Sequence, residues 1–151
     1  MSVSRSVRVE APAQQVWELV SDLPQMGRFS PEATGGRWTR GGGPVAGAVF
    51  TGTNRTGARR WSTKAKVVQA APGKAFAFEV SALGLPGALW SYEIETTPSG
   101  CRVTESWQDR RGTVLRTLGG LVTGRPDREG FTGESIEQTL AAVKAHAEAR
   151  A

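Results

Sequence analysis

The stretch from Asp127 to Ala149 constrains the fold most, because it is the one long segment with a clean helical period. Its apolar residues recur at steps of four, three and four, which places them on one stripe of a helix. These residues are Ile136, Leu140, Val143 and Ala147. Almost everything before them alternates as short strands do. A single long helix after a run of strands needs a sheet to cover its apolar stripe, so we expect a curved antiparallel sheet around this helix.

Two predicted hairpins put their apolar residues on one face of that sheet. Counting back from a tight turn at Thr56-Gly57 pairs Gly52 with Trp61 in the first hairpin. The second hairpin, counted from its own proline-glycine turn, pairs Val67 with Phe78. Because cross-strand partners share a face, the two independent counts predict one continuous apolar surface.

A third hairpin, which turns over residues 97–100, adds a polar pair to this surface. Its register pairs Trp90 with Trp107 and Tyr92 with Glu105. The opposite face of the hairpin is polar and carries complementary charges, which suits solvent. The register therefore predicts that a carboxyl group and a phenol lie together on the inner, aromatic face.

Two short helices are expected after a first strand over Ser4 to Glu10. Pro12 suits the first turn of a helix over Ala13 to Ser21, where its missing N–H costs nothing. Asp22 can cap a second helix over Leu23 to Phe29. These helices follow the first strand and precede the hairpins, so they lie at the start of the sheet.

Length and composition bound the class of protein. A chain of 151 residues can bury its core as a single domain over residues 1–151. Its one cysteine, Cys101, excludes an intrachain disulfide and fits a reducing cytoplasm. No apolar run reaches bilayer length, so we expect no stable membrane insertion. The net charge is +5, but the arginines are scattered along the chain, so we expect no nucleic acid as partner.

Glu105 is the leading candidate for chemistry, because the register places its carboxyl group on an apolar face. Burying a carboxylate costs several kcal/mol unless it is paired. Glu105 is therefore paired, for example with Arg59, or protonated with a raised pKa. With Tyr92 it could form a general acid/base pair or anchor a polar group of a ligand. The alternative is a structural glutamate held by a neighbour.

The inner face also offers candidate ligand contacts. Its aromatic residues could hold a flat ligand by stacking, or could be ordinary core. These residues are Trp61, Trp90, Trp107 and Phe76. Asn54 and Arg59, paired by the count in the first hairpin, could bind a carboxylate or an enolate-like oxygen, or be solvated at the cavity mouth. From the C-terminal helix we expect Thr132 and Ile136, with the part over Glu129 to Gly133 roofing the cavity unless the helix starts near Glu134.

Other chemistries have little support in the sequence. His146 is the only histidine, so we expect neither a histidine triad nor a metal site. The Gly41–Gly43 run lacks the lysine of a phosphate loop, and we expect no cofactor. The segment from Arg110 to Arg128 is basic, partly apolar and broken by glycines. It could form a lid helix at the cavity mouth, extend the core, or lie on a membrane surface.

Several motifs resemble the START-like (SRPBCC, Bet v 1-like) superfamily and its polyketide cyclase/dehydrase group. They are the run Ala11–Pro24 with its Val16-Trp17 pair and Asp22, and the segments Gly52–Arg55, Pro72–Phe78 and Val103–Trp107. The resemblance covers essentially the whole chain. It implies an α+β helix-grip fold, in which a seven-stranded curved antiparallel sheet wraps around a long C-terminal helix and two short helices follow strand one. A cavity lies between sheet and helix in such a fold.

Members of this superfamily include lipid carriers, hormone receptors and aromatase/cyclases. The resemblance thus implies binding of a small hydrophobic ligand, aromatic, polyketide-like or lipid-like, in the cavity between sheet and helix. The alternative is a polyketide cyclase/dehydrase-type enzyme that uses Glu105 and Tyr92 as an acid/base pair. A third class, an interaction module without a ligand, is the least favoured. We expect a cytoplasmic protein that is a monomer or a weak homodimer.

Overall fold

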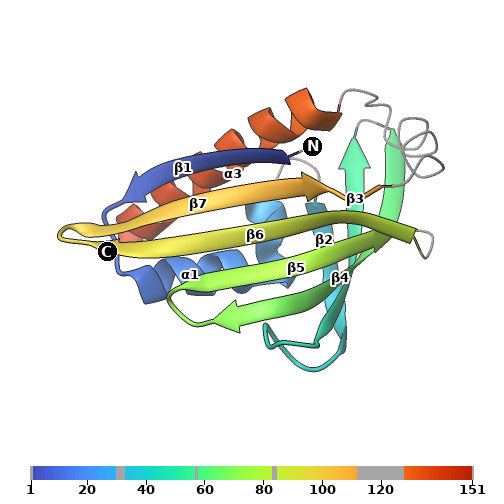
Figure 1. The fold of residues 1–151 in the computed structure, drawn as a ribbon, viewed down its shortest axis with the longest axis horizontal. Helices are drawn as coiled ribbons and strands as arrows, with labels where there is room; N and C mark the ends of the chain where they lie inside the picture. Colours follow the sequence, from blue (N-terminus) through green and yellow to red (C-terminus); the bar gives the residue numbers. More distant parts are fainter. Residues whose placement is uncertain (1, 30–32, 57, 83–84, 112–127, 151) are drawn as a thin grey trace.

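The computed structural model describes residues 2–29, 33–56, 58–82, 85–111 and 128–150 (Figure 1). Within these residues, seven strands form one antiparallel sheet in the order β1-β7-β6-β5-β4-β3-β2. The strands are β1 (Ser2–Val9), β2 (Ala33–Arg40), β3 (Val49–Thr56), β4 (Arg59–Ala71), β5 (Ala75–Ala82), β6 (Leu85–Thr97) and β7 (Gly100–Asp109). The helices are α1 (Ala13–Ser21), the 3-10 helix η1 (Leu23–Arg28) and α3 (Arg128–Arg150).

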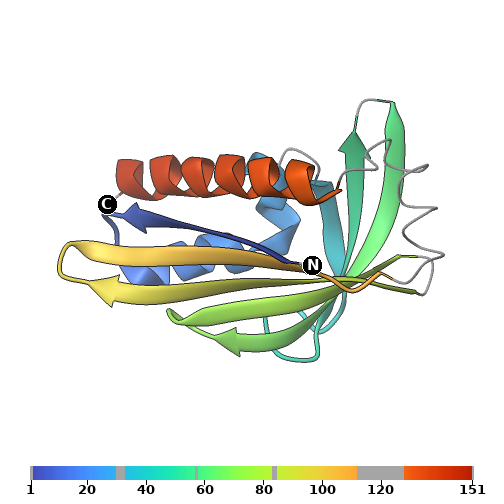
Figure 2. The same cartoon turned by 45° about the horizontal axis from the view of Figure 1, so that its top comes forward.

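The sheet is strongly curved around the C-terminal helix. Figure 2 shows β3 and β4 standing at a steep angle to β6 and β7, with α3 alongside β1 and running in nearly the same direction as β6 and β7. Short helical segments follow β1, as the resemblance implies, although the second of them is a 3-10 helix. The predicted α+β helix-grip architecture is therefore confirmed.

Helix α3 begins and ends within one residue of the predicted bounds, at Arg128 and Arg150. Its aliphatic stripe is buried, as predicted, and consists of Ile136, Leu140, Val143 and Ala147. The alternative start near Glu134 is wrong. Gly133 has a packing role, because a Cβ atom there would lie 3.1 Å from the Arg5 guanidinium and 3.6 Å from the Val3 side chain. A glycine at this point lets α3 approach β1 closely.

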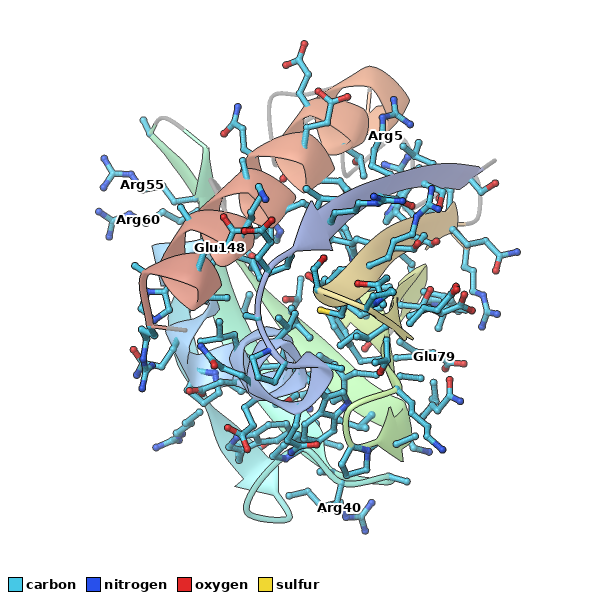
Figure 3. The ribbon with its side chains drawn as sticks, turned by 90° about the vertical axis from the view of Figure 1, so that its left-hand side faces the viewer. Arg5, Arg40, Arg55, Arg60, Glu79 and Glu148 are labelled. Atoms are coloured by element: carbon cyan, nitrogen blue, oxygen red, sulfur yellow. The ribbon has the colours of Figure 1, made fainter. Side chains whose placement is uncertain are left out.

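Polar contacts also hold α3 against β1 along their length. Arg5 donates a hydrogen bond to Glu137 at 3.0 Å, and Lys144 donates to the carbonyl oxygen of Arg8 at 2.9 Å. The backbone N–H of Glu10 donates to Glu148 at 2.9 Å. Figure 3 labels Arg5 and Glu148, which lie toward opposite ends of α3. These contacts fix where each turn of α3 lies along the sheet.

Two of the three predicted hairpin registers are confirmed. In the β6–β7 hairpin, Tyr92 lies opposite Glu105 and Trp90 opposite Trp107. In the β4–β5 hairpin, Val67 lies opposite Phe78, and an irregularity between Val67 and Gln69 absorbs one residue near the turn. Both hairpins place their apolar residues on one surface, as the sequence predicts.

The predicted register of the β3–β4 hairpin is wrong by two residues. Trp61 lies opposite Asn54, and Gly52 lies opposite Thr63, because β3 continues to Thr56 and the turn comes later than Thr56-Gly57. A shift of two residues keeps every side chain on its face, since successive side chains alternate. The residues on the inner face are therefore as predicted, but their cross-strand partners differ from the predicted ones. On the outer face, Arg55 lies opposite Arg60, and both point away from α3 (Figure 3).

Helix α1 covers the sheet beside α3. Val16 and Val20 are fully buried, and the Trp17 indole N–H donates to the carbonyl oxygen of Ala75 at 2.8 Å. This confirms the predicted core face of the first helix. None of the described helices combines the length and apolar character that a membrane span requires. The predicted lid falls mostly on residues 112–127, which lie outside the described residues.

Candidate functional site

A cavity of about 170 Å³ lies between the inner face of the sheet and α3. Strands β3 to β7 supply most of its wall, because alternate residues of each strand point inward. Its aromatic lining residues are Phe50, Trp61, Phe78, Trp90 and Tyr92. Its polar lining residues include Asn54, Thr63, Glu105, Ser135 and Thr139. The cavity is thus a largely aromatic space with few polar groups.

Glu105 and Tyr92 form a hydrogen-bonded pair at this cavity. Both side chains are 2% exposed, and the Tyr92 hydroxyl donates to Oε2 of Glu105 at 2.9 Å. The other oxygen, Oε1, is buried and has no hydrogen-bond partner among the described residues. The confirmed β6–β7 register places the two residues directly opposite each other. The pair therefore has one satisfied carboxyl oxygen and one unsatisfied one.

Burial sets the protonation of this pair. Removal from water raises the pKa of Glu105 from 4.5 to about 8, although the hydrogen bond from Tyr92 acts in the lowering direction. Burial, and then the nearby Glu105, raise the pKa of Tyr92 well above its ordinary value of 10. Both groups are therefore mainly neutral at pH 7. Of the two predicted states for Glu105, the structure favours the protonated acid over an ion pair.

Three of the predicted ligand contacts line the cavity. Trp61 and Trp90 contribute ring surface, and Asn54 lies close by with its amide donating to Oγ1 of Thr63 at 3.1 Å. Asn54 is paired across the strands with Trp61, so the predicted pairing of Asn54 with Arg59 is wrong. The side chain of Arg59 lies outside the described part of the structure. Its predicted role stays a prediction.

Four other predicted contacts are buried outside the cavity lining: Trp107, Phe76, Thr132 and Ile136. Phe76 faces inward, but Trp17 of α1 covers it, with ring centroids 6.1 Å apart. Trp107 lies next to the edge strand, opposite Val3 of β1. These residues share the inward face of the sheet with the cavity residues, yet other elements pack over them.

The contribution of α3 to the cavity comes from Ser135 and Thr139, one helical turn apart. Gly133 packs against β1, and the side chains of residues 129–131 lie outside the described part of the structure, so the expected cavity roof from Glu129 to Gly133 stays a prediction. In the sequence, these two cavity contacts could have been recognised as a pair of small hydroxyl residues beside the aliphatic stripe. Sequence reasoning missed that pair because it considered only the centre of the stripe.

Nothing in the described residues offers an obvious place for a metal ion, since no three His, Cys, Asp or Glu side chains cluster there. The single cysteine, Cys101, is buried near the start of β7, on the same strand as Glu105. The buried pair of Glu105 and Tyr92 can take part in hydrogen bonding and proton exchange.

Comparison with known proteins agrees with this architecture. A family model described as polyketide cyclase/dehydrase and lipid transport matches residues 1–148. A polyketide-cyclase-like protein from Corynebacterium glutamicum is 29% identical with a TM-score of 0.64, over 99% of this chain and 92% of that one. No curated protein sequence matches the chain.

Two further solved structures show the same fold at lower identity. The di-domain ARO/CYC StfQ from the steffimycin biosynthetic pathway is 16% identical with a TM-score of 0.77, over 99% of this chain and 51% of that one. Major latex-like protein 151 from Panax ginseng is 13% identical with a TM-score of 0.70, over 97% of each chain. Because the family model spans nearly the whole sequence, the chain belongs to the polyketide cyclase/dehydrase and lipid transport family.

Proposed function

We propose that the protein binds a small hydrophobic ligand, aromatic, polyketide-like or lipid-like, in the cavity between the sheet and α3. The observation that carries this proposal is the cavity of about 170 Å³ walled by Trp61, Phe78 and Trp90. An apolar protein cavity of about 150 Å³ holds a benzene molecule. A ligand with one aromatic ring and a small substituent therefore suits this space, and aromatic side chains offer it favourable edge and face contacts.

A pair of neighbouring substitutions tests the proposal. Thr63 lines the cavity, whereas Ser62 is exposed on the opposite face of the same strand. Thr63→Phe fills the cavity, so we expect it to abolish the binding of ethylbenzene measured by calorimetry. Ser62→Phe is the matched control and should leave that binding unchanged. Equal ethylbenzene affinity in the two variants would show that the ligand binds elsewhere.

The second candidate function is catalysis of a cyclase/dehydrase type, with Glu105 and Tyr92 as the acid/base pair. The observation that favours it is a buried acid whose pKa is raised to about 8, close to the pH at which a general acid or base works well. In an aldol ring closure, the enol form of one ketone would attack the second carbonyl carbon, Glu105 would donate a proton to the carbonyl oxygen that becomes a hydroxyl group, and the enol O–H would return a proton to the Glu105 carboxylate. Loss of that hydroxyl as water would complete the dehydration.

Product analysis separates the two candidates. We would incubate the protein with a linear aromatic diketone and follow cyclised, dehydrated product by mass spectrometry. An enzyme should lose product formation in Glu105→Gln and Tyr92→Phe while it still binds the diketone. A binding protein should give the same product level as a blank without protein.

A further inference from the structure

We propose that the ligand presents an uncharged hydrogen-bond acceptor, such as a ketone oxygen, to Oε1 of Glu105, which selects neutral carbonyl compounds over carboxylates and amines. This inference rests on the proposed binding function and specifies the chemistry of the ligand at one point of the cavity.

The two carboxyl oxygens of Glu105 have different surroundings. Its Oε2 accepts a hydrogen bond from Tyr92 at 2.9 Å, so this oxygen has the role of the carbonyl in a carboxylic acid. Glu105 lines the cavity, and its Oε1 is buried with no hydrogen-bond partner among the described residues. An unsatisfied buried polar group of this kind destabilises the unliganded protein. A ligand group that completes the hydrogen bond removes this destabilisation.

The described neighbours of Glu105 include no cation that is free to pair with it. On β1, Arg5 lies opposite Glu105 in the register, but its guanidinium donates to Glu137 at 3.0 Å and to the carbonyl oxygen of Ser4 at 2.8 Å. From β6, the facing titratable group is Tyr92. The described lining from β3, β4, β5 and α3 contains no lysine, arginine or histidine. No described cation is therefore in place to stabilise a carboxylate at this position.

The protonation state of Glu105 decides which ligand groups it can bind. With burial raising its pKa to about 8, Glu105 is an acid at pH 7, and its Oε1–H is a hydrogen-bond donor. A ketone oxygen is a suitable acceptor for it. A carboxylate ligand would bring an unpaired negative charge into this apolar space, and a protonated amine would need Glu105 to lose its proton to be paired. The cavity thus discriminates by charge as well as by size.

A matched set of single-ring probes tests this inference. Acetophenone carries the ketone, ethylbenzene lacks an acceptor, benzoate is an anion and benzylamine is a cation. Affinities for the whole protein are measured by calorimetry between pH 6.5 and pH 9. At pH 6.5 we expect acetophenone to bind at least tenfold more tightly than ethylbenzene, and benzoate and benzylamine to bind more weakly than both.

Rising pH should weaken the binding of acetophenone alone. The competent acid form falls to about a tenth of the population one pH unit above the pKa, so acetophenone should bind about tenfold more weakly at pH 9 than at pH 7. Glu105→Gln should keep the acetophenone affinity within a few-fold and lose this pH dependence, because the amide donates the same hydrogen bond. Glu93→Gln, on the exposed face of β6, is the control and should behave as the wild type.

Each outcome bears on the inference. Equal affinities for acetophenone and ethylbenzene at pH 6.5 would leave hydrophobic binding intact and overturn the acceptor contact. Benzylamine binding at pH 6.5 that equals that of acetophenone would also overturn it, because Glu105 would then act as a carboxylate at a pH where the inference requires the acid. If ethylbenzene and acetophenone both fail to bind, the proposed ligand-binding function fails with it.

Discussion

Replacing Glu105 with Gln should change how the stability of the protein depends on pH. Below pH 4.5 the carboxyl group is protonated in both the folded and the unfolded chain. Between pH 4.5 and about 8, the folded protein retains a proton that the unfolded chain has released, because burial raises the pKa. The unfolded state binds fewer protons there, so the free energy of unfolding falls as pH rises. A glutamine is neutral throughout and shows no such loss.

The size of the effect follows from the two pKa values. Each unit of pKa difference between the folded and the unfolded state corresponds to about 1.4 kcal/mol. The rise from 4.5 to about 8 therefore corresponds to a loss on the order of 5 kcal/mol across this pH window. Domains of ordinary stability unfold with about 5–15 kcal/mol. The stability that Glu105→Gln gains relative to the wild type should consequently grow from near zero at pH 4.5 to several kcal/mol at pH 8.5.

Urea unfolding followed by tryptophan fluorescence at pH 4.5, 6.5 and 8.5 measures this gain. Comparison with the wild type at each pH cancels the titration of the other groups. Glu93→Gln, which removes an exposed carboxyl group from the same strand, should show no growth of the difference with pH. A Glu105→Gln difference that is the same at all three pH values would refute the claim that Glu105 is a buried acid.

Three further substitutions test individual contacts. Tyr92→Phe removes the hydrogen bond that lowers the pKa of Glu105, so the pH at which acetophenone binding is half lost should move above the wild-type value; an unchanged midpoint would contradict this contact. Phe76→Ala empties a fully buried core position and should cost about 3–5 kcal/mol in urea unfolding, and a cost below 1 kcal/mol would contradict the packing. Gly100→Ala places a Cβ atom on the carbonyl oxygen of Val9, so it should lower the melting temperature measured by circular dichroism by several degrees. A melting temperature equal to the wild type would show that the two strands separate there at no cost.

The sequence determines the sheet registers only where the turn is unambiguous. The turn between Thr97 and Gly100 contains Pro98 and allows one sensible count, so the opposition of Tyr92 and Glu105 could be predicted. The turn near Gly57 allows two counts of the same parity. Alternation then fixes the face of each residue but not its partner, and the predicted partner of Trp61 is wrong by two residues.

The position of the cavity along the inner face could not be predicted from strand alternation. Phe76 and Trp90 both point inward, yet Trp17 covers one and the cavity exposes the other. Which residues remain uncovered depends on where α1 and α3 lie along the sheet. For α3 that position depends on contacts distant in sequence, such as those of Gly133 with β1. Helical periodicity predicts which side of a helix is buried but not how far along the sheet each turn lies.

The location of Tyr92 and Glu105 within the sheet has a consequence for dynamics. Strands β6 and β7 each pair with a neighbour on both sides, so neither residue lies on an edge of the sheet. Backbone amides in such central strands exchange with solvent mainly through openings that approach global unfolding. The two side chains should therefore keep their relative positions through smaller, local openings of the structure. The conformational entropy of the Tyr92 and Glu105 side chains is therefore lost when the protein folds. A ligand that binds to this pair would lose mainly its own translational and rotational freedom.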